Sequence, residues 1–408
     1  MLCKDSKIYI VVTPFFPASD SFRGSYVYDQ VKAIQRTGKY EVIVFRPKSI
    51  IDKADQYEYQ GIKVYLFPVV DMPSYFFNGL TNGLNACLFV RHIKKLNINL
   101  DQVSVVHGHT SSFGIYGLAL KKKIPAIKVL VQHHDRDPFT IRNGKLAHWR
   151  CNLLYRALVN VNIFNKVDCH VSISSVVEDN LLSFPRPGIY ENYSPYLEKL
   201  RKIQNIRKIH PKNSVILYNG VDRTKFYPLA LHTDTNVFKI GCIGNFVHLK
   251  DQITLINAVE DLIQRQVIPG LQVSFIGSGP LLNMCQQYVV DHHLSHCITF
   301  EEEVMHHQLL QYYNSLDLFV LPSCYEGFGC VYTEAYACGV PFMACKHQGA
   351  AECIQPSDAD KWLIEPHDFK RLSYLIEQYY IHRYSQELTV SYDIDILIKQ
   401  FLEQIDKL

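Results

Sequence analysis

The sequence lacks any long hydrophobic run and carries almost no net charge. Its longest apolar stretches, such as Ile8–Val12, are about five residues long, whereas a helix that spans a bilayer needs about 20 residues. Forty-two Lys and Arg residues stand against 39 Asp and Glu residues, which leaves a net charge of +3 in 408 residues. A protein that holds a nucleic-acid backbone usually has a much larger basic excess. The sequence therefore predicts no transmembrane helix and no nucleic-acid partner.

Cysteine is present, but not in the patterns that carry chemistry. The 12 cysteines are too dilute for a disulfide scaffold, and none forms the C-x2-C pair that is typical of zinc or redox sites. Cys169 and Cys242 lie in strand-like surroundings, where a cysteine usually acts as a small buried hydrophobe. The first residues, Met1–Lys7, lead into a strand-like run without the apolar core or cleavage site of a secretory signal. We therefore expect a cytoplasmic protein in reducing surroundings.

What the sequence does contain is a long alternation of short apolar runs and segments of helical period. This alternation is typical of parallel βαβ units, and near-continuous apolar strands indicate sheets that helices cover on both faces. We expect an α/β protein with two doubly wound parallel sheets, whose ligands bind outside the carboxyl ends of the strands. The expected strands are Lys7–Val12, Glu41–Phe45, Lys63–Phe67, Val103–His107, Ile127–Gln132, His170–Ile173 and Val215–Tyr218 in the first series, and Phe238–Ile243, Gln272–Ile276, Cys297–Phe300, Leu318–Leu321, Pro341–Ala344 and Trp362–Ile364 in the second.

The change between the two series gives the expected domain boundary. Asn219–Asp222 contains the turn signal Asn-Gly, and the charge-rich stretch 223–234 after it lacks a clear period. We expect an N-terminal domain of residues 1–218 and a C-terminal domain of residues 219–387 that face each other across a cleft, with a final helix at about 388–408 that could pack back on the first domain. The basic segment 199–212 is expected to be a solvated helix face, with an acceptor or membrane-surface patch as the alternative.

The most informative segment is Pro322–Pro341, which follows an apolar, strand-like run. Its glycines, Gly327 and Gly329, would let the backbone approach a ligand closely, and a helix that begins near Gly329 would direct its N-terminus at a phosphate. Glu326 falls in the loop and Glu334 about one turn into the helix, so the two carboxylates could reach different parts of one extended ligand. A solvated loop and a helix surface are the alternative explanation for the two glutamates.

This segment resembles the E-x7-E region of the retaining, nucleotide-sugar-dependent glycosyltransferases of family 4, which build bacterial surface polysaccharides and have two Rossmann-like domains, the GT-B fold. Asn219–Pro228 is similar to that family's N-G-V-D-x-x-x-F linker. The resemblance covers nearly all of the C-terminal half and, less closely, the N-terminal half. Shorter similarities are Gly277–Pro280, Leu316–Ser323 and Gly339–Pro341.

The resemblance implies that the two glutamates hold different parts of the donor. Glu326 would hydrogen-bond hydroxyls of the donor sugar, and Glu334 would hold the ribose hydroxyls. The backbone amides of Gly327, Phe328 and Gly329 would meet the sugar and the diphosphate.

The resemblance also implies a phosphate site around Lys250. This residue, in the segment Gly244–Asp251, matches the lysine that neutralises the departing diphosphate, and a cation in an ordinary loop is the alternative. Gly277 and Gly279 are expected to belong to the same donor site. The family usually has Arg where Asn245 stands, so one phosphate cation is missing from the pattern.

In the N-terminal half, the segment after the first expected strand resembles the glycine loop that lies against the diphosphate. Gly24 is its one glycine, where the family often has a pair, and Arg23 beside it could supply the cation absent at Asn245. The family also carries a histidine close to the donor sugar. His134 is the better match and His133 the second choice, with a buried histidine bonded to backbone as the alternative for either.

No metal or cofactor is expected. His133, His134 and Asp135 stand together, and another pair of histidines ends a strand in His107–His109, but a tight metal site needs three or more ligands of suitable geometry. Because Lys250 and a helix N-terminus are available for the leaving charge, transfer does not require a metal. Three Asp-x-Asp triplets are similar to the metal motif of the other large glycosyltransferase fold, and the last two are expected in surface turns: Asp135–Asp137, Asp358–Asp360 and Asp393–Asp395.

We therefore expect a retaining hexosyltransferase that moves a sugar from a UDP- or GDP-sugar to a hydroxyl of a glycan or lipid-linked acceptor, in cell-surface polysaccharide biosynthesis. The C-terminal domain should hold the donor and the N-terminal domain the acceptor, and peripheral contact with the cytoplasmic face of the inner membrane stays open. Two other functions also stay open. One is a nucleotide-sugar 2-epimerase, which needs acid and base carboxylates but no acceptor surface. The other is a non-catalytic sugar-nucleotide binding protein, which Asn245 would favour.

Overall fold

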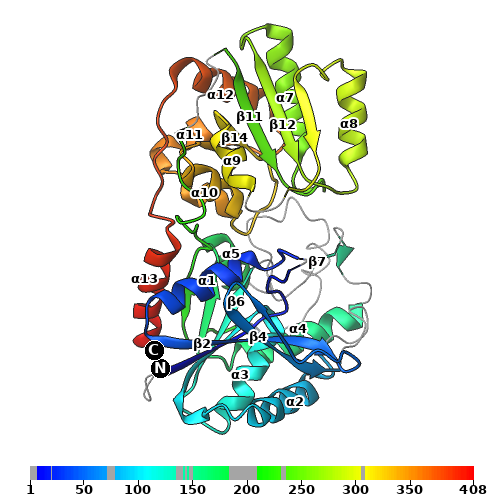
Figure 1. Cartoon of the computed structure of the whole chain (residues 1–408). Helices are drawn as coiled ribbons and strands as arrows, with labels where there is room; N and C mark the ends of the chain where they lie inside the picture. The colour runs from blue at the N-terminus through cyan, green and yellow to red at the C-terminus, as the bar shows by residue number, and fades with distance from the viewer. Residues whose placement is uncertain are drawn as a thin grey trace. The chain divides into compact units, whose positions relative to one another are not determined.

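The structure is a computed structural model that describes residues 7–19, 21–70, 79–134, 141–142, 145–146, 150–182, 209–230, 236–304 and 308–408. The chain divides into two compact units. Unit 1 comprises Met1–Asn219 and Ile394–Leu408, and unit 2 comprises Gly220–Asp393. The end of the chain, drawn in red in Figure 1, thus belongs to the same unit as its beginning, drawn in blue.

Unit 1 is built on an eight-stranded sheet. In sheet order its strands are β10 (Ser214–Ile216), β9 (Cys169–Ser172), β6 (Lys128–His133), β5 (Val103–His109), β1 (Lys7–Val12), β2 (Tyr40–Ser49), β4 (Ile62–Val69) and β3 (Gln56–Tyr59). Five of the six residues of β1 are buried, as expected for a strand that is covered on both faces. Because the strand order reverses between β1 and β5, the sheet is doubly wound and has its switch point there.

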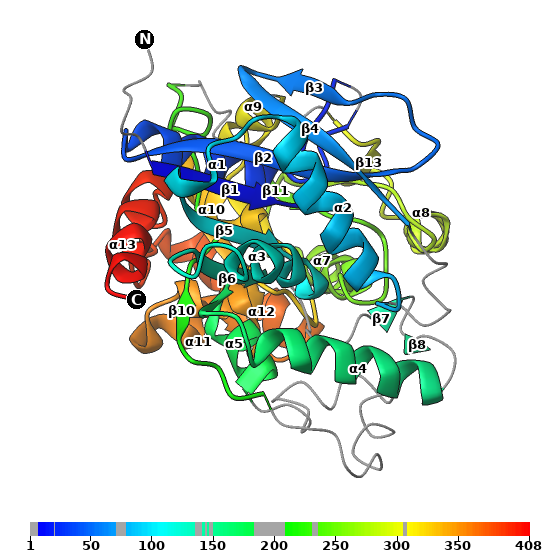
Figure 2. The ribbon, with the colours of Figure 1, turned by 90° about the horizontal axis from the view of Figure 1, so that it is seen from below.

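Helices cover this sheet and close a core of aromatic rings. The helices are α1 (Ser25–Arg36), α2 (Asn82–Lys95), α3 (Gly114–Lys121), α4 (Arg150–Phe164), α5 (Ser175–Leu182) and α13 (Ile394–Asp406), and a short hairpin is formed by β7 (Ile141–Arg142) and β8 (Lys145–Leu146). Helices α2 and α3 lie side by side, as Figure 2 shows. In this core the ring pairs Phe45–Phe89, Phe67–Phe89 and Phe67–Tyr116 have centroids 4.9 to 5.3 Å apart and an edge-to-face orientation, which aromatic rings prefer to a face-to-face sandwich.

The last helix, α13, packs beside α1 in unit 1 (Figure 1). Ile398 and Phe401 on its inner face are buried. Arg36 at the end of α1 forms an ion pair with Asp395 at the start of α13, with an N–O distance of 2.7 Å. The chain therefore completes its first unit only at its C-terminal end.

Unit 2 contains a six-stranded sheet whose described pairings are all parallel. In sheet order its strands are β13 (Ile298–Glu301), β12 (Leu271–Ile276), β11 (Phe238–Ile243), β14 (Leu318–Val320), β15 (Phe342–Cys345) and β16 (Leu363–Ile364). Its helices are α7 (Gln252–Arg265), α8 (Leu282–Asp291), α9 (Leu309–Asn314), α10 (Cys330–Ala337), α11 (Ala359–Trp362) and α12 (Phe369–His382). The strand order reverses between β11 and β14, and such switch points bind ligands at the carboxyl ends of the strands.

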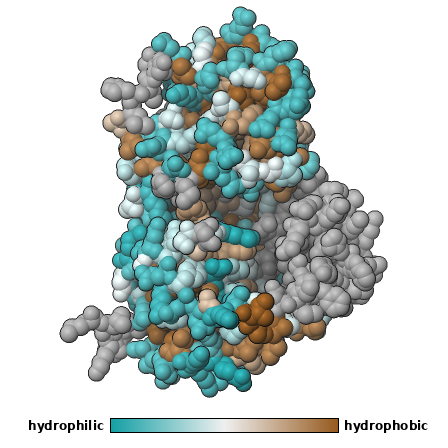
Figure 3. Space-filling model, turned by 45° about the vertical axis from the view of Figure 1, so that its right-hand side comes forward, coloured by the Kyte–Doolittle hydropathy of each residue, from teal (hydrophilic) through white to brown (hydrophobic). Residues whose placement is uncertain are grey.

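The prediction of an α/β protein with two doubly wound parallel sheets is confirmed, and each predicted strand overlaps an observed one. The sequence does not predict β3, which is short and polar and becomes a strand only through antiparallel pairing with β4. On the face drawn in Figure 3, hydrophobic residues form small groups among hydrophilic ones. Within the described ranges, no helix has both the length and the hydropathy needed to cross a membrane.

Candidate functional site

Two loops at the switch point of unit 2 bring Lys250 and Glu326 together. Lys250 follows β11 and Glu326 follows β14. The ammonium group of Lys250 forms an ion pair with Oε1 of Glu326, and Ser323 Oγ donates a hydrogen bond to the same oxygen at 3.1 Å. The side chains of the pair are only 25% and 13% exposed, so salt screens their attraction less than it would on an open surface. The two residues expected at the diphosphate and at the sugar thus form one site.

Glycines shape the backbone around this pair. A Cβ atom at Gly349 would lie 2.1 Å from the carbonyl oxygen of Gly327, and the N–H of Gly349 donates to the carbonyl of Glu326 at 3.0 Å. Gly329 has a φ of +83°, a left-handed conformation that favours glycine, and helix α10 begins at the next residue. The sequence analysis does not identify Gly349, because its contact with Gly327 arises only when the loops after β14 and β15 meet.

Glu334 is buried on α10. It is only 8% exposed, and its Oε2 accepts a hydrogen bond from the hydroxyl of Tyr313 at 2.9 Å. Burial and the nearby carboxylate raise the pKa of Tyr313 well above its usual value, so the phenol remains a donor. The helix-surface explanation is therefore wrong for Glu334, and Tyr313 is a partner that the sequence analysis does not identify. The ring of Phe328 is buried against Tyr392, with centroids 5.6 Å apart, so its side chain belongs to the core.

Gly277 and Gly279 hold the loop after β12 against the loop after β11. Cβ atoms at these positions would lie 2.3 Å from the carbonyl oxygen of Gly244 and 2.6 Å from that of Phe246. Both approaches are too close for any side chain, so the two glycines support the shape of the neighbouring loop. Asn245 is exposed between the two contacts, so a larger, positively charged side chain such as that of Arg would have space at this position.

In unit 1, Gly24 and Arg23 lie around the loop that follows β1. Gly24 has a φ of +92°, and a Cβ atom there would lie 2.5 Å from the carbonyl oxygen of Phe15. The guanidinium of Arg23 stacks 3.7 Å from the centroid of the Phe15 ring, within the range of a cation–π contact. Gly24 thus makes a close backbone approach near the switch point of the unit 1 sheet, and its place against the diphosphate stays a prediction.

Among the described residues, five histidines lie close together on β5, β6 and β9 and directly after β6. Nδ1 of His109 lies 3.0 Å from Nε2 of His134, with the two rings stacked. Nε2 of His133 lies 2.9 Å from Nδ1 of His170, whose Nε2 donates to a backbone carbonyl at 3.0 Å. His133 is fully buried, whereas His134 is only partly buried. Of the two candidates, His134 is therefore the one that a ligand can reach.

Two buried members of this group, His107 and His109, are neutral. Burial, with a smaller contribution from neighbouring histidines, lowers the pKa of His107 to about 3, and the same causes lower the pKa of His109 well below its usual value. Nδ1 of His107 lies 2.8 Å from the hydroxyl of Tyr9, whose pKa burial raises. A neutral imidazole can accept from that phenol, so the contact favours the uncharged ring.

The last two of the three Asp-x-Asp triplets lie within the described residues. Asp358 pairs with Lys361 at 2.7 Å, and Asp395 pairs with Arg36 at 2.7 Å. Both triplets lie at the surface, as expected, but they stand at the starts of α11 and α13 and not in turns. The first triplet, Asp135–Asp137, lies outside the described residues.

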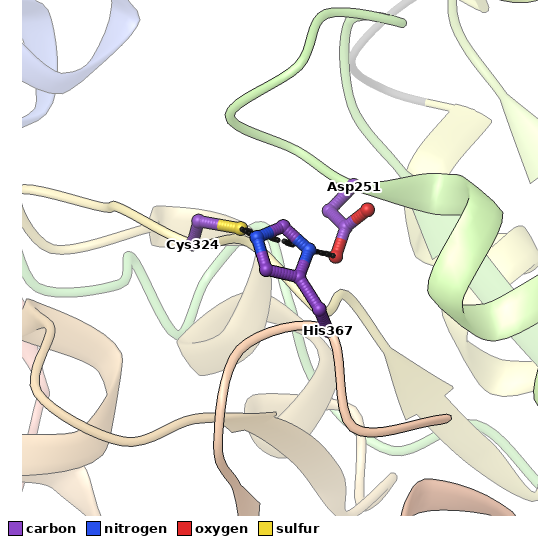
Figure 4. Close-up of side chains that lie close together, drawn as sticks. All are labelled: Asp251, Cys324 and His367. Atoms are coloured by element: carbon purple, nitrogen blue, oxygen red, sulfur yellow. Dashed lines mark hydrogen bonds and ion pairs between the residues drawn. The ribbon is translucent and has the colours of Figure 1, made fainter. Parts of the chain in front are cut away.

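Unit 2 also holds a group of potential metal ligands, two of which, Asp251 and Cys324, stand close in sequence to Lys250 and Glu326. Asp251, Cys324 and His367 bring a carboxylate oxygen, a sulfur and an imidazole nitrogen within 4.8 Å of one another (Figure 4). The sequence does not reveal this group, because its three members come from separate loops of unit 2.

Two family models match the chain. The model described as glycosyl transferases group 1 matches residues 226–389, in unit 2. The model described as glycosyltransferase family 4 matches residues 24–189, in unit 1. Together the two matches include the Lys250–Glu326 pair and, at the start of the second match, Gly24.

Similar sequences include two mannosyltransferases. A GDP-mannose-dependent alpha-(1-6)-phosphatidylinositol monomannoside mannosyltransferase from Mycolicibacterium smegmatis is 31% identical over 28% of this chain and 31% of its own length. The monoacylated alpha-(1-6)-phosphatidylinositol monomannoside mannosyltransferase from Corynebacterium glutamicum, also GDP-mannose-dependent, is 29% identical over 43% of this chain and 49% of its own. The chain thus matches less than half of the length of either relative.

Solved structures match over nearly the whole chain. Sucrose-phosphate synthase from Thermosynechococcus elongatus superposes with a TM-score of 0.68 at 19% identity, over 98% of this chain and 99% of its own. Anabaena HepE in complex with UDP and glucose gives a TM-score of 0.63 at 15% identity, over 98% of this chain and 100% of its own. At such identities the likeness establishes the fold, and it agrees with the GT-B architecture expected from the sequence.

Proposed function

The chain belongs to the family 4 glycosyltransferases, and on that premise we propose that it moves a sugar from a UDP- or GDP-sugar to a hydroxyl of a glycan or lipid-linked acceptor. We also propose that transfer retains the anomeric configuration and serves the synthesis of cell-surface glycans. The observation that carries the proposal is the partly buried ion pair of Lys250 and Glu326 at the switch point of unit 2.

A donor that binds at this position would replace the ion pair with contacts of its own. The ammonium of Lys250 would move from Glu326 to the diphosphate, and Glu326 would then accept hydrogen bonds from hydroxyls of the sugar. Because negative charge on the diphosphate grows as its bond to the sugar breaks, Lys250 would stabilise the transition state more than the bound donor. Glu334, oriented by Tyr313, would hold the ribose hydroxyls.

The remaining chemistry would come from the donor itself. The bond between the anomeric carbon and the phosphate oxygen breaks, and a bond to the acceptor oxygen forms on the same face of the sugar. The leaving diphosphate takes the proton of the acceptor hydroxyl as the sugar passes through an oxocarbenium-like state. Protein groups, with His134 as the candidate near the sugar, position the reactants and neutralise charge.

A lipid-linked acceptor is supported by a pocket between α2 and α3 of unit 1, with a volume of about 480 Å³. Its apolar lining includes Ala86, Val90, Ile115 and Leu118, and its basic lining includes Arg91, Lys94, Lys122 and Lys123. Apolar walls with several cations suit an acyl chain below an anionic headgroup. Both mannosyltransferase relatives bear names that specify phosphatidylinositol monomannoside, which agrees with peripheral contact with a membrane.

Vesicle sedimentation tests this surface. The chain should sediment with vesicles that contain phosphatidylglycerol and stay in solution with phosphatidylcholine alone. Each cation near an anionic surface contributes about 1 kcal/mol, so Lys94→Glu with Lys122→Glu should lower the partition coefficient by at least ~10-fold. Lys361→Glu, on the surface of unit 2, is the matched control. Equal sedimentation with both lipids would remove the pocket from the proposal.

The donor is tested by thermal shift, followed by turnover. A nucleotide at 100 times its dissociation constant should stabilise the protein by about 2.7 kcal/mol, so UDP, GDP, ADP and their sugar conjugates can be ranked in one experiment. Turnover of the best donor with an acceptor, followed by proton NMR of the product, then gives the anomeric configuration. Inversion would overturn the retaining proposal. Donor turnover without acceptor would favour an epimerase, and binding without any turnover would favour a binding protein.

A further inference from the structure

Three side chains with metal-binding chemistry meet in unit 2. Asp251 directly follows Lys250, Cys324 lies two positions before Glu326, and His367 lies between β16 and α12. Figure 4 shows the imidazole of His367 between the sulfur of Cys324 and the carboxylate of Asp251. The group therefore joins three loops, two of which carry the proposed donor site.

The distances among the three ligand atoms are close to those of a tetrahedral site. Oδ2 of Asp251 lies 2.8 Å from Nδ1 of His367, and Sγ of Cys324 lies 3.8 Å from each of these atoms. With Zn–S near 2.3 Å and Zn–N or Zn–O near 2.1 Å, tetrahedral zinc separates its ligands by about 3.3–3.6 Å. Each separation therefore needs to change by about half an ångström. Because the sulfur lies over the face of the imidazole, the ring must also rotate until Nδ1 points toward the metal.

One side of this group is buried in the protein and the other side faces solvent. Asp251 and Cys324 are buried, whereas the side chain of His367 is 63% exposed. An exposed ring can turn toward the space between the other two atoms, and solvent can supply a fourth ligand on the open side. Thiolate, imidazole and carboxylate are ligands that zinc accepts together, whereas Mg²⁺ and Ca²⁺ prefer oxygen alone.

The same three residue types could form a nucleophilic triad, but the geometry argues against it. Sγ of Cys324 lies 3.5 Å from Nε2 and 3.8 Å from Nδ1 of His367. The sulfur is nearly equidistant from both nitrogens, so it faces the ring instead of the lone pair of one nitrogen. Burial also raises the pKa of Cys324 to about 12, which leaves the free thiol unactivated.

We propose that Asp251, Cys324 and His367 form a zinc site with water as the fourth ligand. On binding, Cys324 releases its proton to solvent, His367 coordinates through Nδ1 with its proton on Nε2, and Asp251 contributes one oxygen. The ion ties together the loops after β11, β14 and β16. This site is separate from the transfer step and does not depend on the identity of the donor.

Zinc loading of the full chain tests the site without any donor. Protein treated with chelator is mixed with Zn²⁺, desalted and analysed for bound metal, and the affinity is measured by calorimetry against a competing chelator. We expect one zinc per chain. Replacing a second-shell partner typically costs 10–100-fold in affinity, so loss of a ligand in Cys324→Ala or His367→Ala should cost at least ~100-fold.

Matched variants separate this site from incidental thiols and imidazoles. Cys297→Ala removes another buried cysteine and His382→Ala another exposed histidine, and both should bind zinc as the unmodified chain does. Co²⁺ should give a sulfur-to-cobalt charge-transfer band that disappears in Cys324→Ala. Absence of stoichiometric zinc binding overturns the proposal, and so does unchanged affinity in both Cys324→Ala and His367→Ala. Because His367→Ala leaves an exposed position, a folding defect is not expected to mask the result.

Discussion

Lys250 and Glu326 stand 76 positions apart in the sequence and form an ion pair. They meet because β11 and β14 are neighbours at the point where the strand order of unit 2 reverses. Each charge offsets the other. In the proposed function, a donor would replace the pair with contacts to its diphosphate and its sugar, so that neither charge is left uncompensated.

The two glutamates should separate nucleotide binding from sugar transfer. Glu334→Ala removes the proposed ribose contact and should weaken binding of the free nucleoside diphosphate as well as of the nucleotide sugar. Glu326→Ala should leave affinity for the nucleoside diphosphate nearly intact but abolish most transfer, since the sugar loses the contacts that orient its anomeric carbon. Calorimetric titration with nucleoside diphosphate, beside turnover with the intact donor, measures both effects. If Glu326→Ala loses nucleotide affinity while Glu334→Ala keeps it, the assignments must be exchanged.

Gly349→Ala should distort the loop that carries Glu326 and Gly327. Its Cβ would lie 2.1 Å from the oxygen and 2.6 Å from the carbon of the Gly327 carbonyl, so backbone must shift, at a cost of about 1–3 kcal/mol in unfolding free energy. Donor affinity should fall with the displaced loop. Gly83→Ala is the control, since no atom lies within 4 Å of its added Cβ and alanine should stabilise α2 by about 0.5–1 kcal/mol. Wild-type donor affinity in Gly349→Ala would show that the loop tolerates the shift.

Stability should fall on mild acidification because of His107 and His109. Their pKa values are lowered in the folded protein, that of His107 to about 3, so their stabilising effect is fully present above the unfolded value near 6.5 and is lost as pH falls toward 3. At pH 5 the cost is about 2 kcal/mol for a fully buried histidine. Urea unfolding at pH 7 and pH 5 measures it, and His107→Asn should flatten the dependence. An identical slope in His107→Asn and in the exposed control His382→Asn would show that His107 is not responsible.

Transfer should not require added Mg²⁺ or Mn²⁺, because Lys250, backbone amides and the start of α10 are the proposed phosphate contacts. Activity is measured with chelator and again after either metal is added. Running His367→Ala in parallel separates any effect of the proposed zinc site. Loss on chelation that only Mg²⁺ or Mn²⁺ restores would contradict the account and would favour Asp135–Asp137 as a metal site.

Both sheets could be predicted because buried parallel strands have a clear sequence pattern. Runs such as Tyr9–Val12 and Phe319–Leu321 are apolar without interruption, which fits only strands that are covered on both faces. Strand β3 has no such pattern, because its residues are mostly polar and it forms a strand at the sheet edge only by pairing with β4.

The candidate site could be predicted where its residues share one segment or match motifs of the family that the sequence resembles. Glu326 lies in a loop and Glu334 on the helix that directly follows it, so their spacing can be read from the sequence. The bond from Tyr313 to Glu334 and the approach of Gly349 to Gly327 depend on how separate loops pack, and no local pattern encodes them. For the same reason the sequence does not predict the group of Asp251, Cys324 and His367.

The most direct test is the turnover number of Lys250→Ala at saturating donor, compared with Lys361→Ala, which removes a surface lysine of unit 2. The account predicts a loss of about 10²–10³ in turnover for Lys250→Ala, a smaller change in donor affinity, and wild-type kinetics for Lys361→Ala. A Lys250→Ala variant that kept its turnover number and raised only its Michaelis constant would contradict the account, because Lys250 would then bind donor and transition state equally.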